Sequence, residues 1–189
     1  MIMSRWYIPE LPPVTFKPLP TQPAVRHRAA EVSRMLDEIG ENRTALNTTK
    51  MELGKLKPMF KGFNPESISS SGLDKVGKQL YSFGLIDNLT ADLLGRAALE
   101  FDKDGNPSNP DEEINVLEFF VTQIDEIKAK SLKGDKYAKL LMPDYVRAVH
   151  VLKCLQHFGA TGDSYDSVTR KRREDAGEIP KQQALKPIR

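Results

Sequence analysis

The sequence predicts an all-α protein, and three observations lead to this fold class. Apolar residues return at helical spacing through residues 24–159. Helix-starting and helix-ending residues, such as Asn109-Pro110 and Gly159, separate these stretches. No stretch alternates apolar and polar residues for long enough to indicate a sheet. We expect a long N-terminal amphipathic helix, a compact bundle of about four further helices, an extended proline-rich arm and a disordered C-terminal tail.

Composition excludes several classes of protein. The chain has 189 residues, with 28 Lys and Arg against 26 Asp and Glu, which excludes a strongly basic nucleic-acid coat. The single cysteine, Cys154, excludes an internal disulfide and any two-cysteine metal motif. No apolar run approaches the ~18 residues needed to cross a bilayer, and proline interrupts the N-terminus before a signal core forms. We therefore expect a cytoplasmic protein without a membrane span.

The distribution of prolines and charges divides the chain into four segments: an arm at 1–23, a long helix at 24–57, a helical core at 58–159 and a charged tail at 160–189. Six of the thirteen prolines fall in the arm, which predicts an extended conformation there. Large apolar side chains are interleaved with these prolines, among them Trp6, Tyr7, Leu11 and Phe16. We expect the arm to lie along its own core or in the groove of a partner.

The first long segment carries an apolar residue at every seventh position: Val25, Val32, Ile39, Leu46 and Leu53. The companion row begins with Ala29 and Leu36 but becomes polar at Arg43 and Lys50. This spacing predicts one helix over 24–56, whose stripe packs either on the core or, as in a coiled coil, on another protein or a second copy. Together with the arm, Val32, Ile39, Leu46 and Leu53 are the predicted partner-binding residues.

Four further helices follow from spacing and capping. We expect helices near 71–83 and 89–101, a central helix after Asn109-Pro110 that buries Ile114 to Ile127, and a last helix from about Pro143 to Phe158. Residues 100–126 hold nine acidic residues and one lysine, whereas 128–153 hold seven basic residues and two aspartates. Such blocks attract each other across a helical hairpin, or they form a surface for a partner.

One short motif indicates a cation. Asp102, Asp104, Asn106 and Glu113 occupy positions 1, 3, 5 and 12 of a loop between two expected helices. This segment resembles the calcium loop of an EF hand, which implies oxygen ligands for calcium at those positions. Proline stands at position 6, where that family has glycine, and position 9 is also proline. An Asp-Gly turn that leads into a capped helix explains the same residues.

Two other patterns contain residue types that could bind a metal ion or phosphate. His150, Cys154 and His157 share one side of the last helix, but the histidines project beside Arg147 and Lys153, which opposes a bound zinc ion and favours a solvated polar face. Without a nucleophile, base and oxyanion site in one pattern, we expect neither catalytic residues nor a cofactor. The basic run at 170–173 would contact phosphates, but Glu174 and Asp175 follow it, so nucleic-acid binding is not expected.

These patterns favour a non-enzymatic helical adaptor or accessory protein that acts within a larger assembly. Its partner is another protein or a second copy, bound through residues 24–56 and the arm. A calcium-responsive regulator that uses residues 102–113 is the alternative. A nucleic-acid accessory protein that uses residues 170–173 is the third hypothesis.

Overall fold

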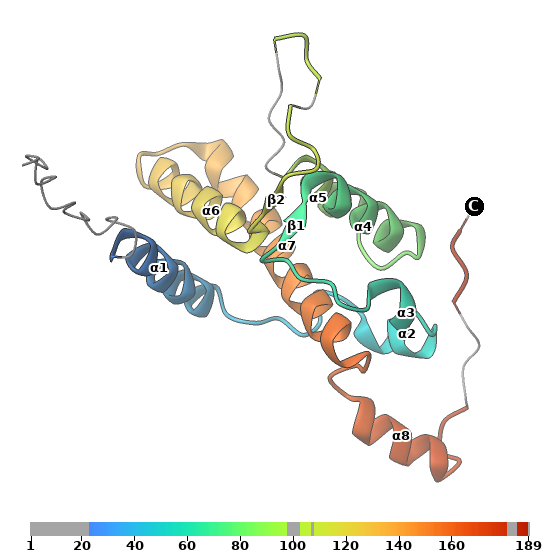
Figure 1. Cartoon of the computed structure of the whole chain (residues 1–189). Coiled ribbons are helices and arrows are strands. Elements are labelled where there is room, and N and C mark those ends of the chain that lie inside the picture. The colour runs from blue at the N-terminus through green and yellow to red at the C-terminus, as the bar shows by residue number, and fades with distance from the viewer. Residues whose placement is uncertain (1–22, 98–102, 107, 181–184, 189) are drawn as a thin grey trace, which may run out of the picture.

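A computed structural model describes residues 23–97, 103–106, 108–180 and 185–188. Most of these residues are helical, as predicted (Figure 1). The helices are α1 (Pro23–Ile39), α2 (Thr48–Leu53), α3 (Lys57–Phe60), α4 (Ser70–Ser82), α5 (Asn88–Arg96), α6 (Val116–Leu132), α7 (Lys136–Thr161) and α8 (Ser167–Asp175), and the strands are β1 (Ile68–Ser69) and β2 (Glu113–Ile114). None of these helices is both long enough and apolar enough to span a membrane.

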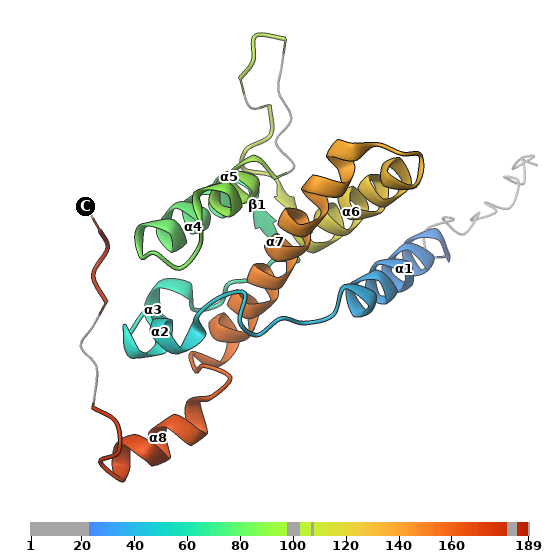
Figure 2. The same ribbon diagram turned by 180° about the vertical axis from the view of Figure 1, so that it is seen from behind.

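Helix α7 is the axis of the fold, because it passes between the other elements and is covered along most of its length (Figures 1 and 2). Val151, Leu155 and Phe158 face a cluster formed with α2, α3 and α4, which includes Leu46 and Met51. A second row on α7 faces a cluster formed with α4, α5 and α6, and its buried members are Ala148, Val149 and Leu152. Two apolar faces on one helix thus join the two halves of the core.

A two-residue antiparallel ladder pairs β1 with β2 and brings the starts of α4 and α6 together, with Ile68 opposite Ile114. The two helices begin just after the ladder, and each has a side-chain cap: Ser69 accepts from the Gly72 N–H, and Asn115 accepts from the Glu118 N–H. The predicted start of the central helix at Asn109-Pro110 is wrong, because α6 begins at Val116. The Pro110 carbonyl instead accepts a hydrogen bond from the Ser71 N–H.

The predicted long helix over 24–56 is wrong, because α1 ends at Ile39. Gly40 adopts a left-handed conformation with φ of +74°, which favours glycine and ends the helix. Residues 40–47 are irregular, and α2 then begins after the cap Asn47. The regular seven-residue spacing therefore does not form one stripe, and Leu46, which is 1% exposed, belongs to the core of this chain.

The last helix of the predicted core begins earlier and ends later than the sequence indicated. Asp135 caps α7 by accepting from the N–H groups of Tyr137 and Ala138, so Pro143 lies inside the helix instead of at its start. The tail was predicted to be disordered over 160–189, which is also wrong for α8. Arg170 of α8 is only 7% exposed. Residues 181–184 and 189 lie outside the described part of the chain.

The axial position of α7 predicts a large stability difference between two leucines of this helix. We expect Leu155→Ala to lower the free energy of unfolding by about 2–5 kcal/mol, because Leu155 is fully buried and its removal leaves a cavity. The same substitution at Leu140, which is 71% exposed, is expected to cost no more than about 0.5 kcal/mol. Urea denaturation followed by circular dichroism measures both, and equal losses would contradict the assigned core.

Candidate functional site

Helix α1 and its groove against α6 form the candidate interaction site, because α1 lies at the side of the body and joins it through the irregular residues 40–47 (Figures 1 and 2). Two ion pairs connect α1 to α6. The Arg28 Nε lies 2.5 Å from Glu118 Oε1, and the Lys128 Nζ lies 3.0 Å from Glu38 Oε1. Because these side chains are partly exposed, each pair contributes at most about 1 kcal/mol.

The C-terminal end of α1 is attached more firmly, through α7. The Lys153 ammonium donates to the carbonyls of Leu36 and Gly40, both at 3.1 Å. The His150 Nε2 lies 3.2 Å from the Ile39 carbonyl. A cation at the C-terminal end of a helix binds carbonyls that have no partner within the helix. It also interacts favourably with the negative end of the helix dipole. Helix α1 is therefore held at its end and along one side.

A groove of about 300 Å³ remains between α1 and α6. It is lined by α1 between Arg34 and Ile39 and by α6 between Val121 and Leu132, and we call it the α1–α6 groove. Its lining residues are mainly apolar: Met35, Ile39, Val121, Ile124, Ala129 and Leu132. Four charged residues, Arg34, Glu38, Asp125 and Lys128, complete the lining. The groove thus combines an apolar interior with charges of both signs.

The predicted partner-binding residues fall into three groups in the structure. Val32 and Ile39 are half-buried on α1, and Ile39 lines the α1–α6 groove. Leu53 is half-buried on α2, whereas Leu46 is buried in the core and is not available to a partner. Trp6, Tyr7, Leu11 and Phe16 lie outside the described residues. Met35 and the α6 residues were missed, because the seven-residue count did not include Met35 and α6 was assigned wholly to the core.

The loop with the EF-hand-like residues connects α5 to β2 and extends away from the helices (Figure 1). Asp104 and Asn106 are exposed, and Asp102 lies outside the described residues. Glu113 lies in β2 at the base of the loop, where its carboxylate accepts a 2.5 Å hydrogen bond from the Ser67 hydroxyl. Within the described part of the chain, no three His, Cys, Asp or Glu side chains are placed to hold a metal ion.

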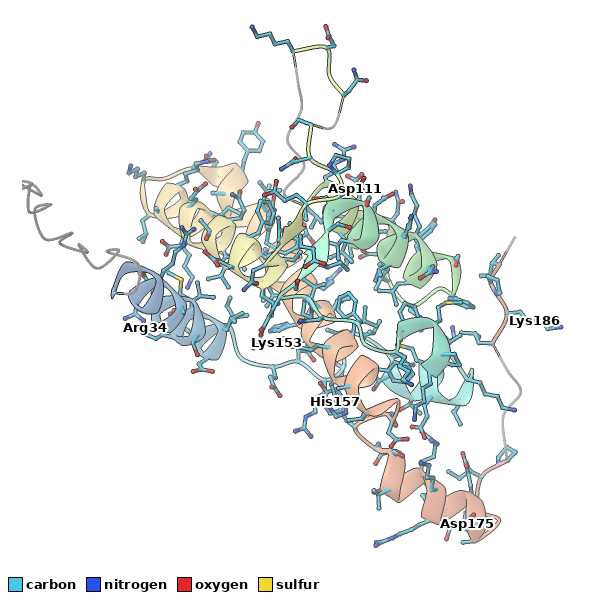
Figure 3. All side chains as sticks on the ribbon, viewed as in Figure 1. Arg34, Asp111, Lys153, His157, Asp175 and Lys186 are labelled. Carbon is cyan, nitrogen blue, oxygen red and sulfur yellow. The ribbon has the colours of Figure 1, made fainter. Side chains whose placement is uncertain are left out.

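The predicted solvated face of α7 is instead covered by the segment that follows α1. The Cys154 thiol, 2% exposed, donates to the Asn42 carbonyl at 3.3 Å, and burial raises the pKa of this thiol. His157 stacks on the Tyr165 ring with 4.1 Å between ring centres. The labelled Lys153 and His157 lie at successive levels of α7 (Figure 3). A neutral, buried thiol is a poor nucleophile. Cys154 instead fixes the connection from α1 to α2 through its bond to Asn42.

The basic run at 170–173 is largely paired within the chain. The Arg170 guanidinium donates to Glu52 of α2, to Glu174 and to the Ser164 hydroxyl. Lys171 pairs with Asp163 at 3.2 Å, and Arg173 pairs with Glu178 at 3.2 Å. Three of the four basic side chains thus have acidic partners in this chain, which reduces the positive charge available to phosphate.

Burial alone raises the pKa of Glu52, but hydrogen bonds from Arg170 and Ser164 outweigh burial and lower the pKa to about 2 from 4.5. The Glu52 carboxylate is 11% exposed and the Arg170 side chain is 8% exposed. Loss of either partner would leave a buried charge without its counterion. This pair attaches α8 to α2 and has a structural role.

Comparison of the chain with protein-family models, with curated proteins and with solved structures gives no match. Function must therefore be inferred from the chain's own residues.

The Glu52–Arg170 pair predicts a specific dependence of stability on pH. Because folding lowers the pKa of Glu52, its contribution is complete above pH 4.5 and is lost as the pH falls toward 2. We expect Glu52→Gln to lower the free energy of unfolding by about 3 kcal/mol at pH 7. The difference from the wild type should shrink at pH 3.

Urea denaturation at both pH values measures this difference. Glu66→Gln at an exposed site is the control, and its cost is expected to stay within about 0.5 kcal/mol. A Glu52→Gln penalty that is the same at pH 7 and pH 3 would show that the charge of Glu52 does not stabilise the fold.

Proposed function

We propose that this chain is a non-enzymatic helical adaptor or accessory protein that acts within a larger assembly, and that α1 is its main contact with another protein. The α1–α6 groove is the observation that supports this function. Its interior offers Met35 and Ile39 of α1 to a partner, with Val121 and Ile124 of α6 below them. Apolar side chains left in a seam between helices form the kind of surface that an amphipathic segment covers.

The partner segment that fits this groove is the apolar face of an amphipathic helix that carries charges of both signs. Arg34 and Lys128 supply positive charge in the lining, whereas Glu38 and Asp125 supply negative charge. A polyanion such as nucleic acid would meet two carboxylates there, so a protein segment is the better complement. The arm leads directly into α1 at Pro23. We therefore also propose that its large apolar residues contact the partner, namely Trp6, Tyr7, Leu11 and Phe16.

Side-chain chemistry near α7 supports the non-enzymatic part of the proposal. His157 stacks on the Tyr165 ring. The other two residues of this region with catalytic potential, His150 and Cys154, contact backbone carbonyls at the end of α1 and in the segment that follows it. Their polar atoms hold the connection between α1 and α2, a structural role that leaves them poorly placed for a substrate.

The groove predicts which methionine matters for binding. The chain is purified from its native source, its stoichiometric partner is identified by mass spectrometry, and the two purified proteins are titrated by calorimetry. We expect Met35→Glu to weaken this binding at least about tenfold, because a carboxylate would be desolvated in the apolar interior.

Met59→Glu is the matched control, since Met59 is 46% exposed on α3 outside the groove, and it should leave the affinity unchanged. Deletion of residues 1–22 tests the arm in the same assay. Equal affinities for the wild type and Met35→Glu, with both proteins folded by circular dichroism, would refute the proposed contact.

A calcium-responsive regulator remains the alternative, and one observation favours it. The loop at 102–113 lies between helices, and its base is fixed by the β1–β2 ladder, where Glu113 contacts Ser67. Calcium bound through Asp102, Asp104, Asn106 and Glu113 would therefore be coupled to the positions of α4 and α6.

Calorimetric titration with calcium distinguishes the two functions. For an adaptor we expect neither heat of binding nor a change in melting temperature, because no ion stabilises the folded state. Heat and a higher melting temperature, both lost in Asp104→Asn and retained in an Asp92→Asn control on α5, would favour the regulator.

A further inference from the structure

The end of the α6–α7 hairpin exposes an unusual concentration of large apolar side chains. We call residues 128–141 the hairpin tip. Leu132 at the end of α6 is 89% exposed, and Tyr137, Leu140 and Leu141 in the first turns of α7 are 79%, 71% and 47% exposed. Residues 137, 140 and 141 are spaced i, i+3 and i+4, so they share one face of α7. These side chains contribute little to the core, and their exposure opposes solubility.

Positive charge surrounds this apolar patch. The hairpin tip holds five lysines, at positions 128, 130, 133, 136 and 139, against the single acidic residue Asp135. The Asp135 carboxylate accepts from the Tyr137 and Ala138 N–H groups at 2.8 and 3.3 Å, where the positive end of the α7 dipole offsets its charge. Lys128 pairs with Glu38, and the other four lysines are exposed.

We propose that the hairpin tip is a peripheral membrane-docking surface, which inserts its apolar side chains into a leaflet that contains anionic lipids. Leu132, Leu140 and Leu141 would enter the boundary between headgroups and acyl chains, and Tyr137 would lie at that boundary with its hydroxyl toward water. The lysines would contact lipid phosphates and carboxylates, with their methylene stems along the apolar surface. Lys128 and Leu132 also line the α1–α6 groove, whereas Tyr137, Leu140 and Leu141 do not, so the two surfaces adjoin. Membrane docking goes beyond the proposed function and does not depend on it.

The shape of the site favours a lipid surface over a protein. The hairpin end stands at the periphery of the molecule, away from α8 and the C-terminal segment (Figures 1 and 2). A protein partner for side chains that project as far as Leu132 and Tyr137 would need a matching hollow, whereas a fluid leaflet accepts a convex apolar wedge without one. Lysines both before and after the turn between α6 and α7 supply the positive charge that an anionic surface attracts.

Vesicle flotation with the purified full chain tests the proposal. One set of vesicles is phosphatidylcholine alone, and the other contains about one third phosphatidylserine, at about 0.1 M salt. We expect the wild type to float with the anionic vesicles and not with the neutral ones. Binding should weaken at least about tenfold at high salt, because the lysine contribution is screened.

Two pairs of variants locate the surface. Leu140→Glu with Leu141→Glu, and separately Lys136→Glu with Lys139→Glu, should each reduce flotation at least about tenfold. Lys75→Glu with Lys78→Glu is the matched control, since these exposed lysines have the same spacing on α4. Leu140 and Leu141 do not line the α1–α6 groove, so these variants should still bind the protein partner that Met35→Glu loses.

Several outcomes would overturn the proposal. One is a wild type that binds neither set of vesicles, and another is a leucine variant that floats as well as the wild type. An equal loss in the α4 control would assign the effect to net charge and not to the hairpin tip. If the leucine variant instead abolishes self-association measured by light scattering, or the contact with the protein partner, while vesicles remain unbound, the tip is a protein interface.

Discussion

Burial of α7 on two faces is the constraint on which the rest of the structure depends. One face packs through Leu155 and Phe158 on α2, α3 and α4, and the other packs through Ala148 and Leu152 on α4, α5 and α6. A surface helix has one apolar stripe, whereas in α7 eight of the twelve residues from 148 to 159 are buried, on two faces of the helix. Elements far apart in the sequence are therefore positioned by their contacts with this one helix.

The polar side chains that remain on α7 determine where α1 lies. Lys153 and His150 bind the carbonyls at the end of α1, and Cys154 binds the Asn42 carbonyl. These bonds satisfy backbone groups exposed by the break at Gly40, which explains why the chain turns there. Because α1 is anchored at its end and meets α6 only along one side, a groove remains between them. The candidate site is thus a consequence of how α1 is attached to α7 and α6.

Sequence patterns predicted the elements whose determinants are local. The helices near 71–83 and 89–101 correspond to α4 and α5. The apolar residues predicted to be buried at 117–127 are buried in α6, whereas Ile114 lies in β2 and is half-buried. The failures have long-range causes. Leu46 fits the seven-residue spacing of apolar residues because its side chain packs in the core, and not because α1 continues to this position. The sequence near Arg170 predicts a solvated tail, but the fold places Glu52, 118 residues earlier, beside this side chain. Half of the predicted partner-binding set lies in the arm and remains a prediction.

The opposite charges of the blocks 100–126 and 128–153 were expected to attract each other across a hairpin or to form a surface. The described ion pairs instead join each block to a residue outside both blocks: Glu118 pairs with Arg28, Lys128 with Glu38, and Arg147 with Asp87. Helix α1 thus supplies partners of both signs along the length of α6. The exposed lysines beyond it surround exposed leucines, and neither group adds much to folding stability. Because the exposed lysines and leucines of the hairpin tip add little to stability, a role in binding another surface explains best why they occur together.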